Sequence, residues 1–147
     1  MKILFICTGN TCRSPLAELY VAHQLAGLPV EVASAGLATW GGSPISAASR
    51  HILDRYGIDA SAFRSRVVTP EMLFQSDLII AVSEAHRARL LQIAPQKETS
   101  IRLLSEFSGG NYDIPDPYGG DQASYDKIFA VMKPSLDGVV AFVKGRL

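Results

Sequence analysis

The sequence has few cysteines, no long apolar run and no excess of charge of either sign. Its two cysteines lie close together near the N-terminus, which does not suit a disulfide framework. The first apolar run is too short for a signal peptide, and no later run approaches the length of a membrane span. Fourteen basic residues balance fourteen acidic ones, so nothing indicates a nucleic-acid partner. We therefore expect a cytoplasmic protein that binds neither nucleic acid nor membrane.

Histidine is also scarce, and its spacing does not suggest a metal site. The three histidines, His23, His51 and His86, are scattered over segments of helical pattern. We interpret them as surface or core residues rather than as ligands.

The chain length and composition indicate one compact domain that spans residues 1–147. Of its 147 residues, 48% are hydrophobic and 19% are charged, which is typical of a globular protein with a sizeable core.

Apolar strand patterns alternate with helical patterns along the chain. The predicted strands are residues 2–7, 30–33, 77–82 and 101–104. The predicted helices are residues 14–25, 46–56, 83–94 and 124–144, with a short one from residue 69 and Pro134 expected to kink or split the last. This alternation predicts a three-layer α/β fold with a parallel sheet and right-handed crossovers. In such folds ligands bind beyond the carboxyl ends of the strands.

The segment that follows the first predicted strand reads CTGNTCRSP (residues 7–15). A short loop before a helix can hold a tetrahedral anion with its backbone N–H groups and the positive end of the helix. Those groups and Arg13 would favour the thiolate of Cys7, so we predict that Cys7 is a nucleophile. Arg13 offers a planar fork of donors to phosphoryl oxygens. Ser14 is the predicted N-cap, with Pro15 at the first helical position.

A cysteinyl-phosphate reaction also needs a group that gives a proton to the leaving oxygen and later takes one from water. Asp116 is the best candidate, because prolines on both sides stiffen its backbone within a long predicted loop, residues 105–123. An Asp-Pro pair also occurs as a simple turn. Asp113 and Asp121 are weaker alternatives.

Over essentially its full length, the sequence resembles the low-molecular-weight protein tyrosine phosphatases. The resemblance rests on residues 7–15, on Ser34-Ala35-Gly36 followed by Trp40, and on Asp116-Pro117-Tyr118. It implies a flavodoxin-like fold with a sheet of order 2-1-3-4. It also implies an enzyme that uses no metal and no cofactor, acts on a phosphorylated protein or peptide, and releases inorganic phosphate. We expect a monomer.

The resemblance further implies a role for each residue of the site. Cys7 would be the nucleophile, Arg13 the clamp on the transition state, and Asp116 the general acid and then the base. Ser14 would stabilise the Cys7 thiolate, while Asn10 and Ser34 would hold the loop in shape. The phosphate would be bound by Thr8, Gly9, Asn10, Thr11, Cys12 and Arg13.

The residue type at position 11 bears on the substrate. Family members that act on phosphotyrosine commonly carry Ile there, whereas a subgroup that acts on phosphoarginine carries Thr, as this chain does at Thr11. Trp40 and Tyr118 are expected to line the substrate, although Trp40 also fits a role as hydrophobic cover. Aromatic walls stack on a phenol or on a guanidinium. We place phosphotyrosine first and phosphoarginine second.

Two other functions compete with phosphatase activity. Related arsenate reductases need two further cysteines, and none follows Cys12 in this chain. Cys12 itself is equally compatible with packing and with a reversible bridge to Cys7. A non-catalytic phosphate-binding module is disfavoured because a nucleophile, an arginine and an acid are all present.

Overall fold

The computed structural model describes residues 1–147 and contains one parallel sheet of four strands. The strands are β1 (Lys2–Cys7), β2 (Glu31–Gly36), β3 (Leu78–Ala81) and β4 (Ile101–Leu103). Their order across the sheet is β2-β1-β3-β4, with every pairing parallel, which confirms the predicted fold class and order.

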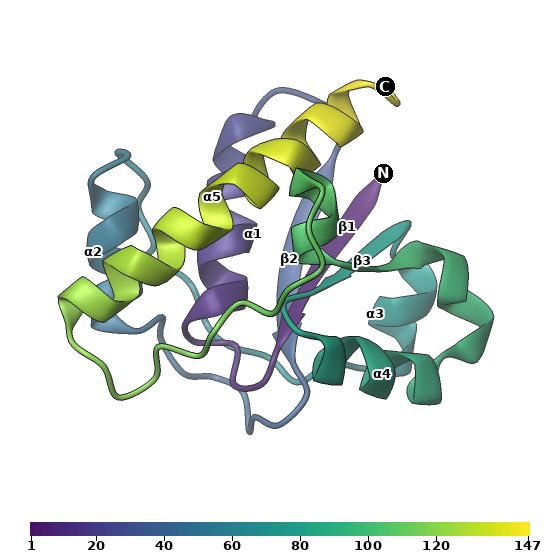
Figure 1. Cartoon of the computed structure of the whole chain (residues 1–147), viewed down its shortest axis with the longest axis horizontal. Coiled ribbons are helices and arrows are strands. Elements are labelled where there is room, and N and C mark those ends of the chain that lie inside the picture. The colour runs from purple at the N-terminus through teal and green to yellow at the C-terminus, as the bar shows by residue number, and fades with distance from the viewer.

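Helices cover both faces of the sheet (Figure 1). One layer contains α1 (Arg13–Gln24), α2 (Ala47–Asp54) and α5 (Gln122–Lys144), and the other contains α3 (Pro70–Gln75) and α4 (Glu84–Ile93). Two 3-10 turns, η1 (Pro95–Ser100) and η2 (Leu104–Ser108), flank β4. No helix combines the length and the apolar character that crossing a membrane requires.

The central strand β1 is buried on both faces, because its side chains alternate between two apolar cores. Ile3 and Phe5 belong to the larger core, which includes residues of α1 and α5. Leu4 and Ile6 belong to the smaller core, which includes residues of α3 and α4. A near-continuous apolar sequence is what such a strand requires. The loop after β1 therefore leaves the middle of the sheet at its carboxyl edge.

The predicted start of the first helix was wrong. Helix α1 begins at Arg13, and the N-cap position is Cys12, whose side chain makes no capping hydrogen bond. Ser14 lies inside the helix, with Pro15 one residue further, so Ser14 is not the N-cap. The physical reason is that the Ser14 hydroxyl is engaged by the preceding loop, as described below.

Three further boundaries differ from the prediction. Strand β2 continues to Gly36 because its last residues pair with the end of β1, up to Cys7. Pro134 does not split α5, which is one helix of 23 residues. The predicted loop at 105–123 begins within the turn η2 and ends where α5 starts.

Candidate active site

The loop between β1 and α1 forms the floor of a pocket of about 240 Å³ at the carboxyl edge of the sheet. The segment between η2 and α5 contributes Asp116 and Tyr118 to its lining, and this segment can be followed in Figure 1. The structure thus brings together residues that lie more than a hundred positions apart in the sequence. The pocket is lined by Cys7, Thr8, Gly9, Asn10, Thr11, Cys12, Arg13, Asp116 and Tyr118.

Asn10 gives the loop its shape. It has a φ of 56° and is the only residue other than glycine with a positive φ. Asparagine visits this left-handed region more readily than most residues. In this conformation the Asn10 backbone N–H donates to Cys7 Sγ at 3.3 Å. The turn therefore directs one backbone donor at the sulfur.

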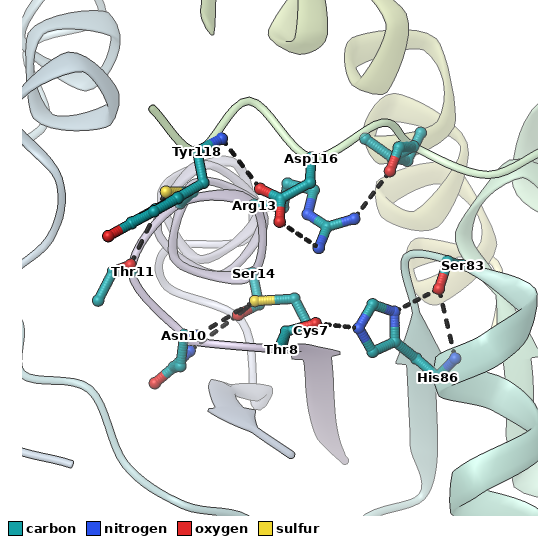
Figure 2. A network of polar contacts seen from close by, with 12 residues as sticks. Cys7, Thr8, Asn10, Thr11, Arg13, Ser14, Ser83, His86, Asp116 and Tyr118 are labelled. Atoms are coloured by element: carbon teal, nitrogen blue, oxygen red, sulfur yellow. Dashed lines mark hydrogen bonds and ion pairs between the residues drawn. The ribbon is translucent and has the colours of Figure 1, made fainter. Parts of the chain in front are cut away.

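A hydrogen-bond network fixes a second donor on the sulfur, the Ser14 hydroxyl (Figure 2). The Arg66 backbone N–H donates to Asn10 Oδ1 at 2.9 Å, so the Asn10 amide nitrogen is the donor toward Ser14 and Ser34. Ser14 Oγ accepts that bond at 2.8 Å, and its own proton remains for Cys7 Sγ, also at 2.8 Å. The Asn10 N–H and the Ser14 hydroxyl are therefore both directed at Cys7 Sγ.

Glu18 ends this network on its far side. The Ser34 hydroxyl donates to Glu18 Oε1 at 2.6 Å. Burial raises the pKa of Glu18, and the bond from Ser34 and the charge of Arg66 oppose that rise. Arg66 Nε also donates to the Ser34 carbonyl at 3.2 Å. Sequence reasoning missed the hydrogen bond of Glu18, because Glu18 lies on α1 and its partner Ser34 lies on β2.

Arg13 is a buried cation on the wall of the pocket. Its Nη1 donates to the Ile114 carbonyl at 2.8 Å, and its Nη2 lies 3.7 Å from Asp116 Oδ2. Its Nε is buried and has no hydrogen-bond partner. A buried guanidinium with donors left over suits an anion in the pocket.

Asp116 lies at the pocket with its side chain about half exposed. Its Oδ1 accepts from the Tyr118 backbone N–H at 3.0 Å. The carboxyl group therefore reaches both the pocket and water, as a group that exchanges protons with a substrate and with solvent must.

The two alternative aspartates serve other contacts. Asp113 Oδ1 accepts from the Glu84 backbone N–H at 2.8 Å, at the start of α4. Asp121 is the N-cap of α5 and accepts from the Ser124 backbone N–H at 2.9 Å. This backbone bond lowers the pKa of Asp121. Neither residue lines the pocket.

Of the two predicted aromatic walls, the structure brings only Tyr118 to the pocket. Tyr118 lines it and remains largely exposed. Trp40 is fully exposed and lies over a separate hollow with Ala38 and Thr39.

Both cysteines are buried and free. Cys12 Sγ lies 3.2 Å from the Tyr125 hydroxyl and 3.7 Å from Thr11 Oγ1. Burial and then the bond to Cys12 raise the pKa of Tyr125 to about 12. Cys12 thus has polar and packing contacts of its own in the reduced protein.

Sequence reasoning also missed His86. Its Nε2 lies 2.7 Å from Thr8 Oγ1, and its Nδ1 hydrogen-bonds with Ser83 Oγ (Figure 2). Burial and then the charge of Arg13 lower the pKa of His86. The available signal was its position three residues after Ser83, the serine that caps the helix following β3. No cluster of three or more histidine, cysteine or carboxylate side chains is arranged to hold a metal ion.

Comparisons with known proteins agree with this geometry. A family model described as low molecular weight phosphotyrosine protein phosphatase matches residues 2–146. Low molecular weight protein-tyrosine phosphatase A of Mycobacterium tuberculosis is 34% identical over 156 residues, which cover 100% of this chain and 94% of the relative. A protein-arginine-phosphatase of Geobacillus stearothermophilus is 38% identical over 121 residues, which cover 81% of this chain and 80% of the relative.

Solved structures share the whole fold. The YwlE arginine phosphatase from Geobacillus stearothermophilus superposes with a TM-score of 0.91 at 32% identity, over 99% of this chain and 94% of that one. A low molecular weight protein tyrosine phosphatase from T. tengcongensis superposes with a TM-score of 0.90 at 34% identity, over 96% of this chain and 98% of that one.

Proposed function

The chain belongs to the low molecular weight phosphotyrosine protein phosphatase family, and from this premise we propose that it hydrolyses phosphotyrosine in proteins through a cysteinyl-phosphate intermediate. The observation that carries the proposal is the meeting of Cys7, Arg13 and Asp116 in one pocket, with two donors aimed at Cys7 Sγ.

In the first step the Cys7 thiolate attacks phosphorus and the bond to the tyrosine oxygen breaks. Asp116 gives its proton to that leaving oxygen. The guanidinium of Arg13 and the backbone N–H groups of the loop stabilise the charge that spreads over the phosphoryl oxygens in the transition state. Tyr118 offers its ring to the aryl group of the substrate.

In the second step the Asp116 carboxylate takes a proton from water, which attacks the phosphocysteine. The sulfur–phosphorus bond breaks, inorganic phosphate forms, and the Cys7 thiolate is regenerated. The Ser14 hydroxyl donates to the departing sulfur, which makes Cys7 a better leaving group.

The test is the hydrolysis of phosphotyrosine peptides by the wild type and by Cys7→Ser. We expect Cys7→Ser to abolish turnover, because a serine hydroxyl in this loop is not ionised at neutral pH. Its circular dichroism spectrum and unfolding curve should match those of the wild type. Turnover by folded Cys7→Ser at the wild-type rate would contradict the proposal.

One observation favours phosphoarginine as a second candidate substrate. Thr11 lines the pocket with a small, partly polar side chain, and a relative 38% identical to this chain is a protein-arginine-phosphatase. The Thr11 hydroxyl can accept a hydrogen bond from a guanidinium, whereas a phenyl ring is stabilised more by contact with an aliphatic side chain.

Thr11→Ile separates the two substrates. Phosphotyrosine and phosphoarginine peptides of the same sequence are compared by kcat/KM in the wild type and in the variant. If Thr11 selects the substrate, the preference shifts toward phosphotyrosine in Thr11→Ile. An unchanged preference would remove Thr11 from the argument.

A further inference from the structure

His86 reaches the phosphate-binding loop from a different element of the fold. It lies in the first turn of α4, which follows β3, the neighbour of β1 in the sheet. Its ring is buried against the loop, with Nε2 at 2.7 Å from Thr8 Oγ1 (Figure 2). None of the catalytic roles proposed above uses this contact.

The partners of Ser83 decide which nitrogen of His86 carries the proton. Ser83 is buried, and its Oγ accepts from the His86 backbone N–H at 3.3 Å. The only other partner of Ser83 Oγ is His86 Nδ1. If Nδ1 were the donor, the Ser83 hydroxyl proton would have no acceptor. The serine therefore donates to Nδ1, and Nε2 carries the proton of the neutral ring.

This tautomer fixes the role of the Thr8 hydroxyl. His86 Nε2–H donates to Thr8 Oγ1, so the single proton of Thr8 is free to make another bond. Thr8 lines the pocket and is exposed there. Its backbone is held separately, because its carbonyl accepts from the Ala38 N–H at 2.9 Å. The contact from His86 thus acts on the side chain, not on the path of the loop.

We propose that His86 is a positioning residue that turns the Thr8 hydroxyl proton into the pocket, where it donates to a phosphoryl oxygen of the substrate. The inference rests on the proposed function, since it names a side-chain donor for the phosphoryl group that the same pocket would bind. Burial and then the positive charge of Arg13 lower the pKa of His86, against the opposing charges of Asp113 and Asp116, and so favour the neutral imidazole that this arrangement requires.

The test is a double-mutant cycle on Thr8 and His86. Thr8→Val removes the hydroxyl. His86→Leu removes the ring donor and fills its place with an apolar side chain of similar size. A hydrogen bond to a charged group implies that each single variant lowers kcat/KM about tenfold. Because both act through one bond, the double variant should lose about as much as either single variant. If the loss in the double variant equals the product of the two single losses, the proposal is overturned.

Two further variants separate positioning from packing. His86→Gln keeps a nitrogen donor toward Thr8 and should retain most of the activity that His86→Leu loses. His51→Ala changes an exposed histidine of α2 and serves as the matched control, with wild-type kinetics expected. Equal losses in His86→Gln and His86→Leu would show that only packing matters.

The dissociation constant for inorganic phosphate, measured by calorimetry, gives a readout that does not need turnover. It should rise about tenfold in Thr8→Val, a variant that changes no residue of α4. Unchanged phosphate affinity in Thr8→Val would refute the role of the hydroxyl, even if His86→Leu does not fold. If the wild type binds phosphate in this way but hydrolyses no phosphopeptide, the proposed function fails and the positioning role stands.

Discussion

Replacing Gly36 by alanine should distort the phosphate-binding loop, because the added Cβ would clash with the loop backbone on the side away from the pocket. Gly36 ends β2 and pairs with Cys7 at the end of β1. A Cβ on Gly36 would lie 2.6 Å from the Thr8 carbonyl oxygen and 3.1 Å from Asn10 Cβ. Real Cβ atoms essentially never approach another atom closer than 3.0 Å, so the loop and the end of β2 must separate by at least 0.4 Å. The closest contact is a backbone oxygen, which cannot rotate away as a flexible side chain could.

We expect Gly36→Ala to lose about 1–3 kcal/mol of unfolding free energy through overpacking. The loss of kcat/KM should be about tenfold or more, because a displacement of about 1 Å at a catalytic group can cost about a hundredfold. The assay is peptide dephosphorylation, normalised to folded protein, with stability from urea unfolding.

Gly138→Ala is the matched control for this effect. Its Cβ would lie 2.0 Å from the Phe107 carbonyl oxygen, where α5 packs on η2 and not on the pocket. It should lower stability without lowering the activity of each folded molecule. If Gly36→Ala keeps wild-type kcat/KM, or if both variants lose activity equally, the expectation that a small shift of the phosphate-binding loop lowers kcat/KM is refuted.

Three further predictions follow from the site. Asp116→Ala should slow aryl phosphates with poor leaving groups by about 10²–10⁴-fold and those with good leaving groups far less, and equal slowing would place the acid elsewhere. Arg13→Lys should lower kcat/KM by more than about tenfold, because lysine cannot donate two parallel hydrogen bonds to the phosphoryl oxygens. The loss should be smaller than the loss caused by removing Cys7. For Glu18 the folded pKa lies above the ordinary 4.5, so its contribution to stability is present below pH 4.5 and lost as the pH rises through the folded pKa. The unfolding free energy of the wild type minus that of Glu18→Gln should therefore fall as the pH rises above 4.5, and a constant difference would contradict the burial of the carboxylate.

The buried strands were predictable because near-continuous apolar runs mark them. Their order across the sheet was predicted only from the family resemblance. The start of α1 was not predictable from capping rules. Ser14 has the residue type of an N-cap, but its hydroxyl is used by Asn10 and Cys7 across the loop. Local sequence does not reveal a competition with a tertiary partner.

The same reason explains the residues that sequence reasoning misplaced around the pocket. The spacing of His86 from Ser83 marks the start of a helix but not the contact with Thr8, which lies in the loop after β1. Nothing in the local sequence indicates that the fold brings the Ser34 hydroxyl to Glu18. Trp40 has the residue type of a substrate wall, but its loop leaves it exposed over a separate hollow.

The cysteinyl-phosphate intermediate is tested most directly by mass spectrometry of the protein after rapid quenching of its reaction with an aryl phosphate. Asp116→Ala should be used beside the wild type, because loss of the base slows breakdown of the intermediate. We expect a phosphoryl group on Cys7 and on no other residue, with none in Cys7→Ala. A phosphoryl group on a different residue, or steady turnover of Asp116→Ala with Cys7 never modified, would contradict it.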